Sequence, residues 1–367
     1  MIYNKTKIIF IISLLFAACT SKQKQNGSDF FNRKAMLENY AENLILPAYL
    51  DFTEATGNLQ SKVDVFCNEP NSENLLKARE AFIETALKWQ FANSFNFGPA
   101  GESGLQKSLI EEIAAFPLNI DKTENYIKAG DYTFNNFDRD TRGLFAIDYL
   151  LFVHSTDSII SIFNQNNYKL YLKKCADEIK NKAVFVSNSW QSGYKQSFIN
   201  NNGTDIGSST SYFYNEFLKS FEALKNFKLA IPLGLRPGQT KPLPKNVEAF
   251  YSGISIKLAK AHWQALKYIW DGIGFKNNNP NGIGLKEYLE SVEGGKELIS
   301  STVAQMAAVD NAFNQLNDNE RLSDLILNDF NKVNAVHIEL QKQTRFFKSD
   351  LSSLIGIAIT YSSGDGD

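Results

Sequence analysis

The spacing of apolar residues is the feature of this sequence that most restricts its fold. Between positions 72 and 94 an apolar side chain recurs every three or four residues, as on one buried face of a helix: Leu75, Ala78, Phe82, Ala86 and Trp89. Asn71 and Ser72, directly after Pro70, can cap such a helix. We therefore predict a helix from Ser72 to about Ser94.

The same helical period continues along most of the chain. It predicts helices over 35–55 (with a kink at Pro47), 168–187, 211–229, 246–271, 296–316 and 321–347. We find no alternation of apolar and polar residues long enough to predict a sheet. The sequence therefore predicts an all-α protein with about eight main helices. The polar loop near Asn200 divides it into two packed bundles, residues 31–200 and 201–367.

Composition restricts the class of partner. The chain has 367 residues, of which 43% are hydrophobic and 21% charged, which is typical of a globular protein. Its formal net charge is −2, so no basic excess is present to bind nucleic acid.

The N-terminus has the pattern of an export signal. Two lysines precede a short apolar stretch, which ends in Ala17-Ala18-Cys19. This ending resembles a bacterial lipobox, so we interpret residues 1–18 as a lipoprotein signal peptide, Cys19 as the lipidated residue and 19–30 as a polar tether. We expect the protein to be anchored to a membrane of the cell envelope, facing the periplasm rather than the cell surface. An ordinary cleaved signal peptide is the alternative.

Two cysteines remain beyond the signal, Cys67 and Cys175. In an exported protein they could form a disulfide, and two buried free thiols fit the sequence equally well.

The segment Leu144–Val153 is apolar or aromatic at every position except Asp148. A helix with this pattern is buried on most sides, and a buried carboxylate must be paired, hydrogen-bonded or bound to a cation. Physical considerations favour a structural pair with an arginine, a tyrosine or a backbone donor. The alternative is an acid of a ligand site, where buried carboxylates are frequent.

Motifs of the common hydrolases are missing from the sequence. The three histidines, His154, His262 and His337, do not form the HExxH pattern of zinc peptidases, and no GxSxG elbow is present. Within the predicted 246–271 helix, Glu248, Ser252 and Ser255 share one face, which is either solvated or lines a cleft.

Four stretches of the chain resemble the imelysin-like family. Gly143–Phe152 has the frame of the family segment GxHAxExLLW, and three further stretches resemble other family segments in the same order. These are LLKAREAFIETALKWQFANSFNFGPAG, AAFPLNIDKTENYI and LAIPLGLRPGQTKPLPKNVEAFYSGIS. The resemblance implies two helical bundles with a site near their interface, export with a lipid anchor, and a link to iron. It also carries a peptidase label.

The sequence departs from the family motif where the metal ligands are expected. Phe145 replaces the motif histidine and Asp148 replaces the glutamate, so coordination by imidazole and carboxylate is lost. An all-oxygen site for iron or another divalent cation could use Asp148 and Glu248 instead. Alternatively, the pocket binds an organic ligand, or nothing.

We therefore expect a binding protein in iron or other nutrient acquisition, and not an enzyme. The expected pocket lies between the bundles and comprises Arg142, Gly143, Phe145, Asp148, Glu248, Tyr251 and Ser252. In it, Gly143 would allow close approach of helices, and Arg142 would face an anionic ligand or Asp148. Expected partners are the membrane, a small ligand or metal ion, and an outer-membrane uptake protein. A metallopeptidase and a structural lipoprotein with a vestigial site are the alternatives.

Overall fold

The computed structural model describes residues 31–102, 104–276 and 282–361. The predicted signal peptide, Cys19 and tether lie outside these ranges. Helices and connecting turns make up the described chain, and no strand occurs in it. The predicted all-α fold is therefore confirmed.

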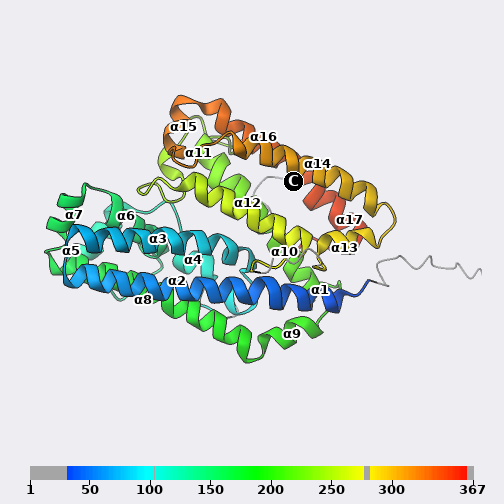
Figure 1. The fold of residues 1–367 in the computed structure, drawn as a ribbon, viewed down its shortest axis with the longest axis horizontal. Helices are drawn as coiled ribbons and strands as arrows, with labels where there is room; N and C mark the ends of the chain where they lie inside the picture. Colours follow the sequence, from blue (N-terminus) through cyan, green and yellow to red (C-terminus); the bar gives the residue numbers. More distant parts are fainter. Residues whose placement is uncertain (1–30, 103, 277–281, 362–367) are drawn as a thin grey trace, which may run out of the picture.

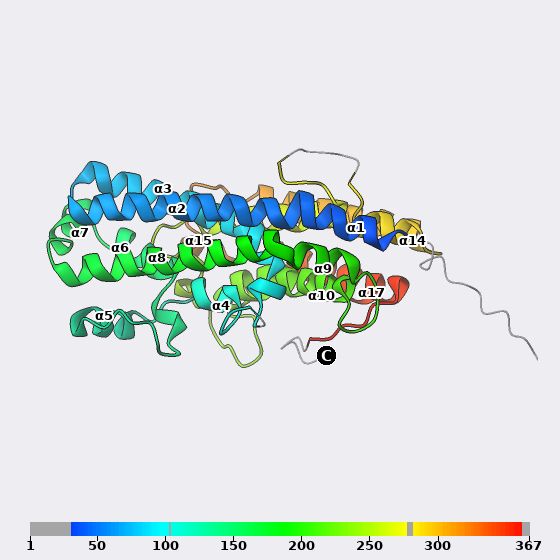
Figure 2. The ribbon, with the colours of Figure 1, turned by 90° about the horizontal axis from the view of Figure 1, so that it is seen from below.

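Helices from the first half of the chain form one elongated layer (Figure 1). Its long members run along the molecule, and shorter helices cover their ends and one side (Figure 2). The layer contains α1 (Arg33–Asn39), α2 (Leu46–Asn68), α3 (Ser72–Ala92), α4 (Leu109–Ile113), α5 (Ile120–Ala129), α6 (Leu144–Phe152), α7 (Thr156–Ile162), α8 (Asn166–Ser189) and α9 (Lys195–Asn200).

Helices from the second half pack on this layer, mainly through α12 against α3. They are α10 (Ser209–Glu222), α11 (Ile231–Leu233), α12 (Ser255–Asp271), α13 (Leu285–Glu290), α14 (Gly295–Asn314), α15 (Leu322–Asn328), α16 (Phe330–Thr344) and α17 (Leu351–Ile355). One continuous set of buried apolar side chains extends through both layers.

The predicted start of α3 is confirmed. The Asn71 side chain accepts a hydrogen bond from the backbone N–H of Asn74 at 2.8 Å, which satisfies one of the unpaired donors of the first turn. Near Pro47 the chain stays helical from Arg33 to Asn68. A π-helical segment, Tyr40–Ile45, separates α1 from α2 directly before the proline.

The predicted helix from Asn246 is wrong in its first third. Residues 248–253 form turns, and α12 begins only at Ser255. Ala249 and Gly253 have positive φ angles of 52° and 73°, which a helix cannot contain. The predicted 321–347 helix is also divided, because Asp329 adopts a non-helical φ of −145° between α15 and α16.

Cys67 and Cys175 are free and buried, so they do not form a disulfide with each other. Burial raises the pKa of each thiol to about 12. Both side chains therefore remain protonated and serve as core residues.

Within the described ranges, no single helix is long and apolar enough to cross a membrane. One bent pair, Arg139–Phe152 with Thr156–Ile162, passes the same test of length and composition.

We expect Asn71→Ala to lower the free energy of unfolding by about 1 kcal/mol, because the first turn of α3 loses its side-chain acceptor. Chemical denaturation would measure the change. Asn71→Asp retains an acceptor and is the matched control. Equal losses in the two variants would contradict a capping role.

Candidate functional site

Asp148 attaches the second layer to the first. Its side chain projects from α6 and is 1% exposed. One carboxylate oxygen accepts the backbone N–H of Tyr251 and the other accepts that of Ser252, both at 2.9 Å. Both donors belong to residues 247–254, which we call the clamp loop. From the sequence, we considered an arginine, a tyrosine or a backbone donor as the partner of Asp148. In the structure, backbone N–H groups are its hydrogen-bond donors.

Arg321 holds the clamp loop from its carbonyl side. Its guanidinium donates to the carbonyl oxygens of Phe250 and Tyr251, the latter at 3.4 Å. These bonds and those to Asp148 replace the helical hydrogen bonds that the loop would otherwise make, which explains why α12 starts late. The helical face predicted for Glu248 and Ser252 therefore does not exist.

The carboxyl group of Asp148 titrates at an unusually high pH. Burial raises its pKa from 3.8 to about 6, and the hydrogen bonds from Ser252 and Tyr251 and the charge of Arg321 limit the rise. At neutral pH the group is therefore mainly ionised, as acceptance of two backbone N–H groups requires.

Arg142 does not neutralise Asp148. Its guanidinium lies 3.5 Å from Glu112 and donates to the carbonyl oxygen of Phe134. The adjacent Gly143 has a φ of +78°, and a Cβ atom there would lie 2.3 Å from the carbonyl oxygen of Ile113. Gly143 thus permits a close approach between α6 and α4, in agreement with the role expected from the sequence.

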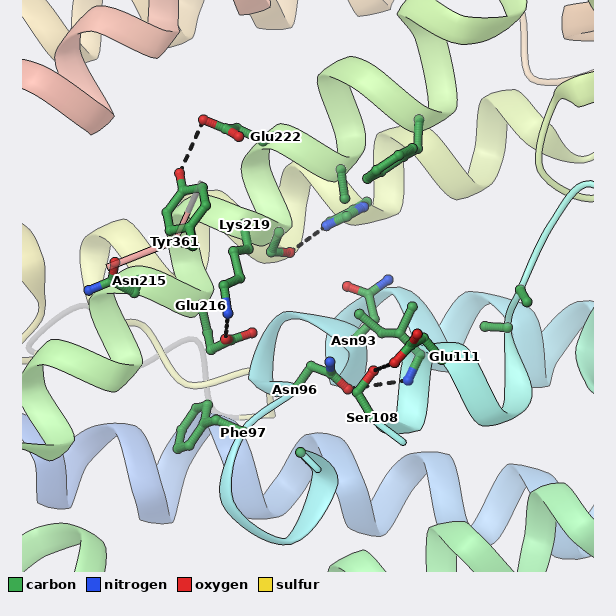
Figure 3. A pocket seen from close by; sticks show the side chains of 18 of the residues that line it. Asn93, Asn96, Phe97, Ser108, Glu111, Asn215, Glu216, Lys219, Glu222 and Tyr361 are labelled. Carbon is green, nitrogen blue, oxygen red and sulfur yellow. Dashed lines mark hydrogen bonds and ion pairs between the residues drawn. The ribbon is translucent and has the colours of Figure 1, made fainter. Parts of the chain in front are cut away.

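A cavity of about 1060 Å³ lies between the two halves of the chain, lined by residues from positions 89–194 and 212–361. Figure 3 shows Asn93, Asn96 and Ser108 on one side, with Glu216, Lys219 and Glu222 across from them. Its aromatic lining comprises Trp89, Phe97, Phe116, Tyr194, Tyr212, Phe227 and Tyr361.

The expected pocket residues are distributed among different places. Glu248 lines the large cavity, whereas Asp148, Tyr251 and Ser252 meet beside it. Phe145 also lies behind the wall, where its ring contacts that of the lining residue Phe116, with ring centroids 5.3 Å apart. Arg142 and Gly143 line a separate pocket, described below.

A buried ion pair forms part of the cavity wall. The Lys228 ammonium lies 2.8 Å from Glu248, and both side chains are at least nine-tenths buried. Gln90 from α3 donates to Glu248 at 3.1 Å and accepts a bond from Lys228. Burial lowers the pKa of Lys228, while the charge of Glu248 opposes the shift. Gln90 therefore connects the first layer to a charge pair of the second.

A second polar chain crosses the same boundary. His262 Nε2 lies 2.7 Å from Ser220 Oγ, which lies 2.8 Å from Ser94 Oγ. Burial, reinforced by the positive charge of Lys228, lowers the pKa of His262 well below its ordinary value. The imidazole is therefore neutral at physiological pH and adds no charge to the cavity.

The described residues contain no group of three histidine, cysteine, aspartate or glutamate side chains placed to hold a metal ion. The two carboxylates predicted as metal ligands have other partners. Asp148 accepts backbone N–H groups, and Glu248 pairs with Lys228 and Gln90.

Sequence reasoning missed Gln90, Lys228 and Arg321. Lys228 carried a usable signal, since it is the only charged side chain among the apolar residues from Phe227 to Leu233. Like Asp148, Lys228 is a charged group within an apolar stretch and therefore needs a partner when it is buried. Gln90 and Arg321 have no comparable pattern, because only the packing of distant segments gives them partners.

Comparisons with known proteins agree with this architecture. The imelysin family model matches residues 45–344, and the chain therefore belongs to the imelysin family. Comparison with curated proteins gave no match.

Two crystal structures share the fold. A putative iron-regulated protein A precursor from Parabacteroides distasonis aligns with a TM-score of 0.72 at 17% identity, covering 88% of this chain and 95% of that one. An imelysin-like protein from Psychrobacter arcticum aligns with a TM-score of 0.71 at 17% identity, covering 90% and 97%.

We expect the stability of the wild type to fall relative to Asp148→Asn as the pH rises from about 4 to about 6. The folded state holds the Asp148 proton more tightly than the unfolded chain does, so protonation of Asp148 favours folding. This contribution to stability is lost as the pH rises through the pKa of Asp148 in the folded state. The shift corresponds to roughly 3 kcal/mol across the window. Urea unfolding of both proteins as a function of pH measures the difference. Parallel pH profiles would contradict the raised pKa.

Proposed function

We propose that this chain is a non-catalytic binding protein of the cell envelope, whose ligand is a small polar organic molecule held in the cavity between the two layers. The observation that carries the proposal is the exposure of aromatic side chains at this cavity. Tyr212 is 52% and Phe227 is 56% exposed, and both line it. Aromatic rings with one open face offer a stacking surface for the apolar faces of a ring-shaped ligand.

The rest of the lining supports a ligand with hydroxyl or amino groups. Asn93 and Asn96 contribute amides to the lining, while Glu216 and Glu222 contribute carboxylates. Glu216 pairs with Lys219 at 2.5 Å, and Glu222 accepts from Tyr361 at 3.1 Å. Side chains of this kind orient a polar molecule within a largely apolar cavity.

A directly coordinated metal ion has less support as the ligand. Of the two carboxylates predicted as metal ligands, Glu248 pairs with Lys228 at 2.8 Å, and the positive charge of Lys228 would repel a cation. Phe145 also supplies no donor atom where the family motif has histidine. The same observations weigh against a metallopeptidase, which needs at least three protein ligands around its ion.

A role in nutrient acquisition is the setting we favour. The name of one structural relative refers to regulation by iron. We therefore retain iron acquisition, with iron carried by an organic chelator as one candidate cargo. In this proposal Cys19 carries the lipid anchor, the polypeptide faces the periplasm, and an outer-membrane uptake protein receives the ligand.

We expect the protein to retain a small organic molecule when it is purified without denaturation. Unfolding the purified protein should release this molecule, and mass spectrometry would detect it. Elemental analysis of the same sample tests for metals. If nothing co-purifies, a panel of sugars, amino acids and iron chelates is screened by thermal shift. Stoichiometric iron or zinc that is lost in Asp148→Ala would overturn the proposal in favour of a metal site.

We expect Phe227→Ala and Tyr212→Ala each to weaken binding of the identified compound about tenfold, since each removes a stacking surface. Calorimetric titration measures the change. Phe185→Ala is the matched control, because Phe185 on α8 is 44% exposed and does not line the cavity. Equal affinity in all three variants would exclude the cavity as the binding site.

We expect Cys19→Ala to move the protein from the membrane fraction to the soluble fraction, because the variant cannot be lipidated. Cell fractionation followed by immunoblotting measures the distribution. Cys67→Ala is the control. An unchanged membrane fraction for Cys19→Ala would contradict the anchor.

A further inference from the structure

A second pocket, separate from the large cavity, lies where α8 faces the segments on either side of α5. Its volume is about 340 Å³, and polar side chains dominate its lining. Arg142, Lys174 and Lys182 contribute positive charge to it, and Glu112 and Glu178 contribute negative charge. Gln106, Thr133 and Asn135 add uncharged polar groups.

Glu112 is shared among more cations than it can neutralise. Arg139 lies 2.9 Å from this carboxylate, Arg142 lies 3.5 Å away and Lys182 lies 3.9 Å away. Direct charge-assisted hydrogen bonds between nitrogen and oxygen are about 2.7–2.9 Å long, so the second and third contacts are loose. Arg142 is also 5% exposed. Its guanidinium donates to the carbonyl oxygen of Phe134 and, at 3.5 Å, to Glu112, so the buried positive charge is only loosely paired with a carboxylate.

Glu178 is the second carboxylate of the cluster. It contacts Lys174 at 2.6 Å and Lys182 at 3.1 Å. Burial opposes its ionisation, but the two lysines outweigh that effect and hold its pKa below the ordinary value. Lys182 therefore bridges the two carboxylates.

The cluster has an excess of positive charge. Four cations, Arg139, Arg142, Lys174 and Lys182, face two carboxylates, which leaves two positive charges in a protein whose overall charge is −2. The nearby Asp138 pairs with Lys122 at 2.8 Å and is also influenced by the charge of Arg142. Because Asp138 and Lys122 have opposite charges, including both of them leaves the excess unchanged. A partly buried excess of charge is costly unless a counter-ion offsets it.

We propose that this pocket binds the phosphate group of a small phosphate monoester, with Arg142, Lys174 and Lys182 as its recognition residues. A phosphate monoester carries nearly two negative charges at neutral pH, which matches the excess. The planar guanidinium of Arg142 suits a tetrahedral oxyanion, and the flexible ammonium groups of the lysines can turn toward it. The remaining volume accommodates the organic part of the ligand beside Gln106 and Asn135.

Titration calorimetry of the purified protein with inorganic phosphate and with glycerol 3-phosphate, at constant ionic strength, tests this site. We expect saturable binding of both compounds. Lys182→Gln should weaken it about tenfold, because one charged contact is lost. Lys180→Gln is the matched control, since Lys180 lies two residues away on α8 and bonds Gln60 at 2.7 Å instead. It should leave the affinity within twofold.

Thermal unfolding without phosphate checks that the variants are folded. If Lys182→Gln does not fold, Lys174→Gln replaces it as the test variant. Absence of saturable heat with both anions would overturn the proposal, as would equal weakening by Lys180→Gln and Lys182→Gln. Co-sedimentation with vesicles that contain phosphatidic acid, whose phosphate is also a monoester, distinguishes lipid phosphate from soluble phosphate. If the protein binds the vesicles and Lys182→Gln abolishes this binding, the site is supported and its phosphate group belongs to a lipid. None of these results depends on the ligand of the large cavity.

Discussion

The two hydrogen bonds that Asp148 accepts from the clamp loop are the interaction on which the arrangement of the two layers depends. They join the buried helix α6 to a loop about one hundred residues later in the chain, and Arg321 holds the opposite edge of that loop. A carboxylate can be kept this deep because both of its oxygens have donors. The loop in turn carries Glu248 into the cavity wall, so the anchor positions one end of the buried ion pair.

The boundary between the layers is consequently polar at its centre. Gln90, Lys228 and Glu248 form one connected group, and Ser94, Ser220 and His262 form another. Each group takes residues from both layers, so relative movement of the layers would leave charged or polar atoms without partners. This cost favours one fixed arrangement of the layers, with the cavity as a permanent feature.

Phe145 stands where the resemblance to the family segment predicts a histidine, and this difference bears on the chemistry of the region. A phenyl ring packs edge-on against Phe116 behind the cavity wall, where an imidazole could have offered a donor atom. Asp148 remains as an acid at the position of the glutamate, and its oxygens are occupied by backbone donors. The region thus contains an anchor where the resemblance predicts a coordinating pair, which is why we favour an organic ligand.

The sequence by itself determined the all-α class, the cap of α3 and the need of Asp148 for a buried partner, because periodicity, capping and the cost of burying a charge are local properties. It could not locate the partner, since Tyr251 and Ser252 act through backbone N–H groups, which every residue except proline has. Only the tertiary structure decided that 247–254 is a loop. There, hydrogen bonds from distant residues outweigh a helical pattern, just as packing of distant segments brought Lys228 to Glu248 and Arg142 to Glu112.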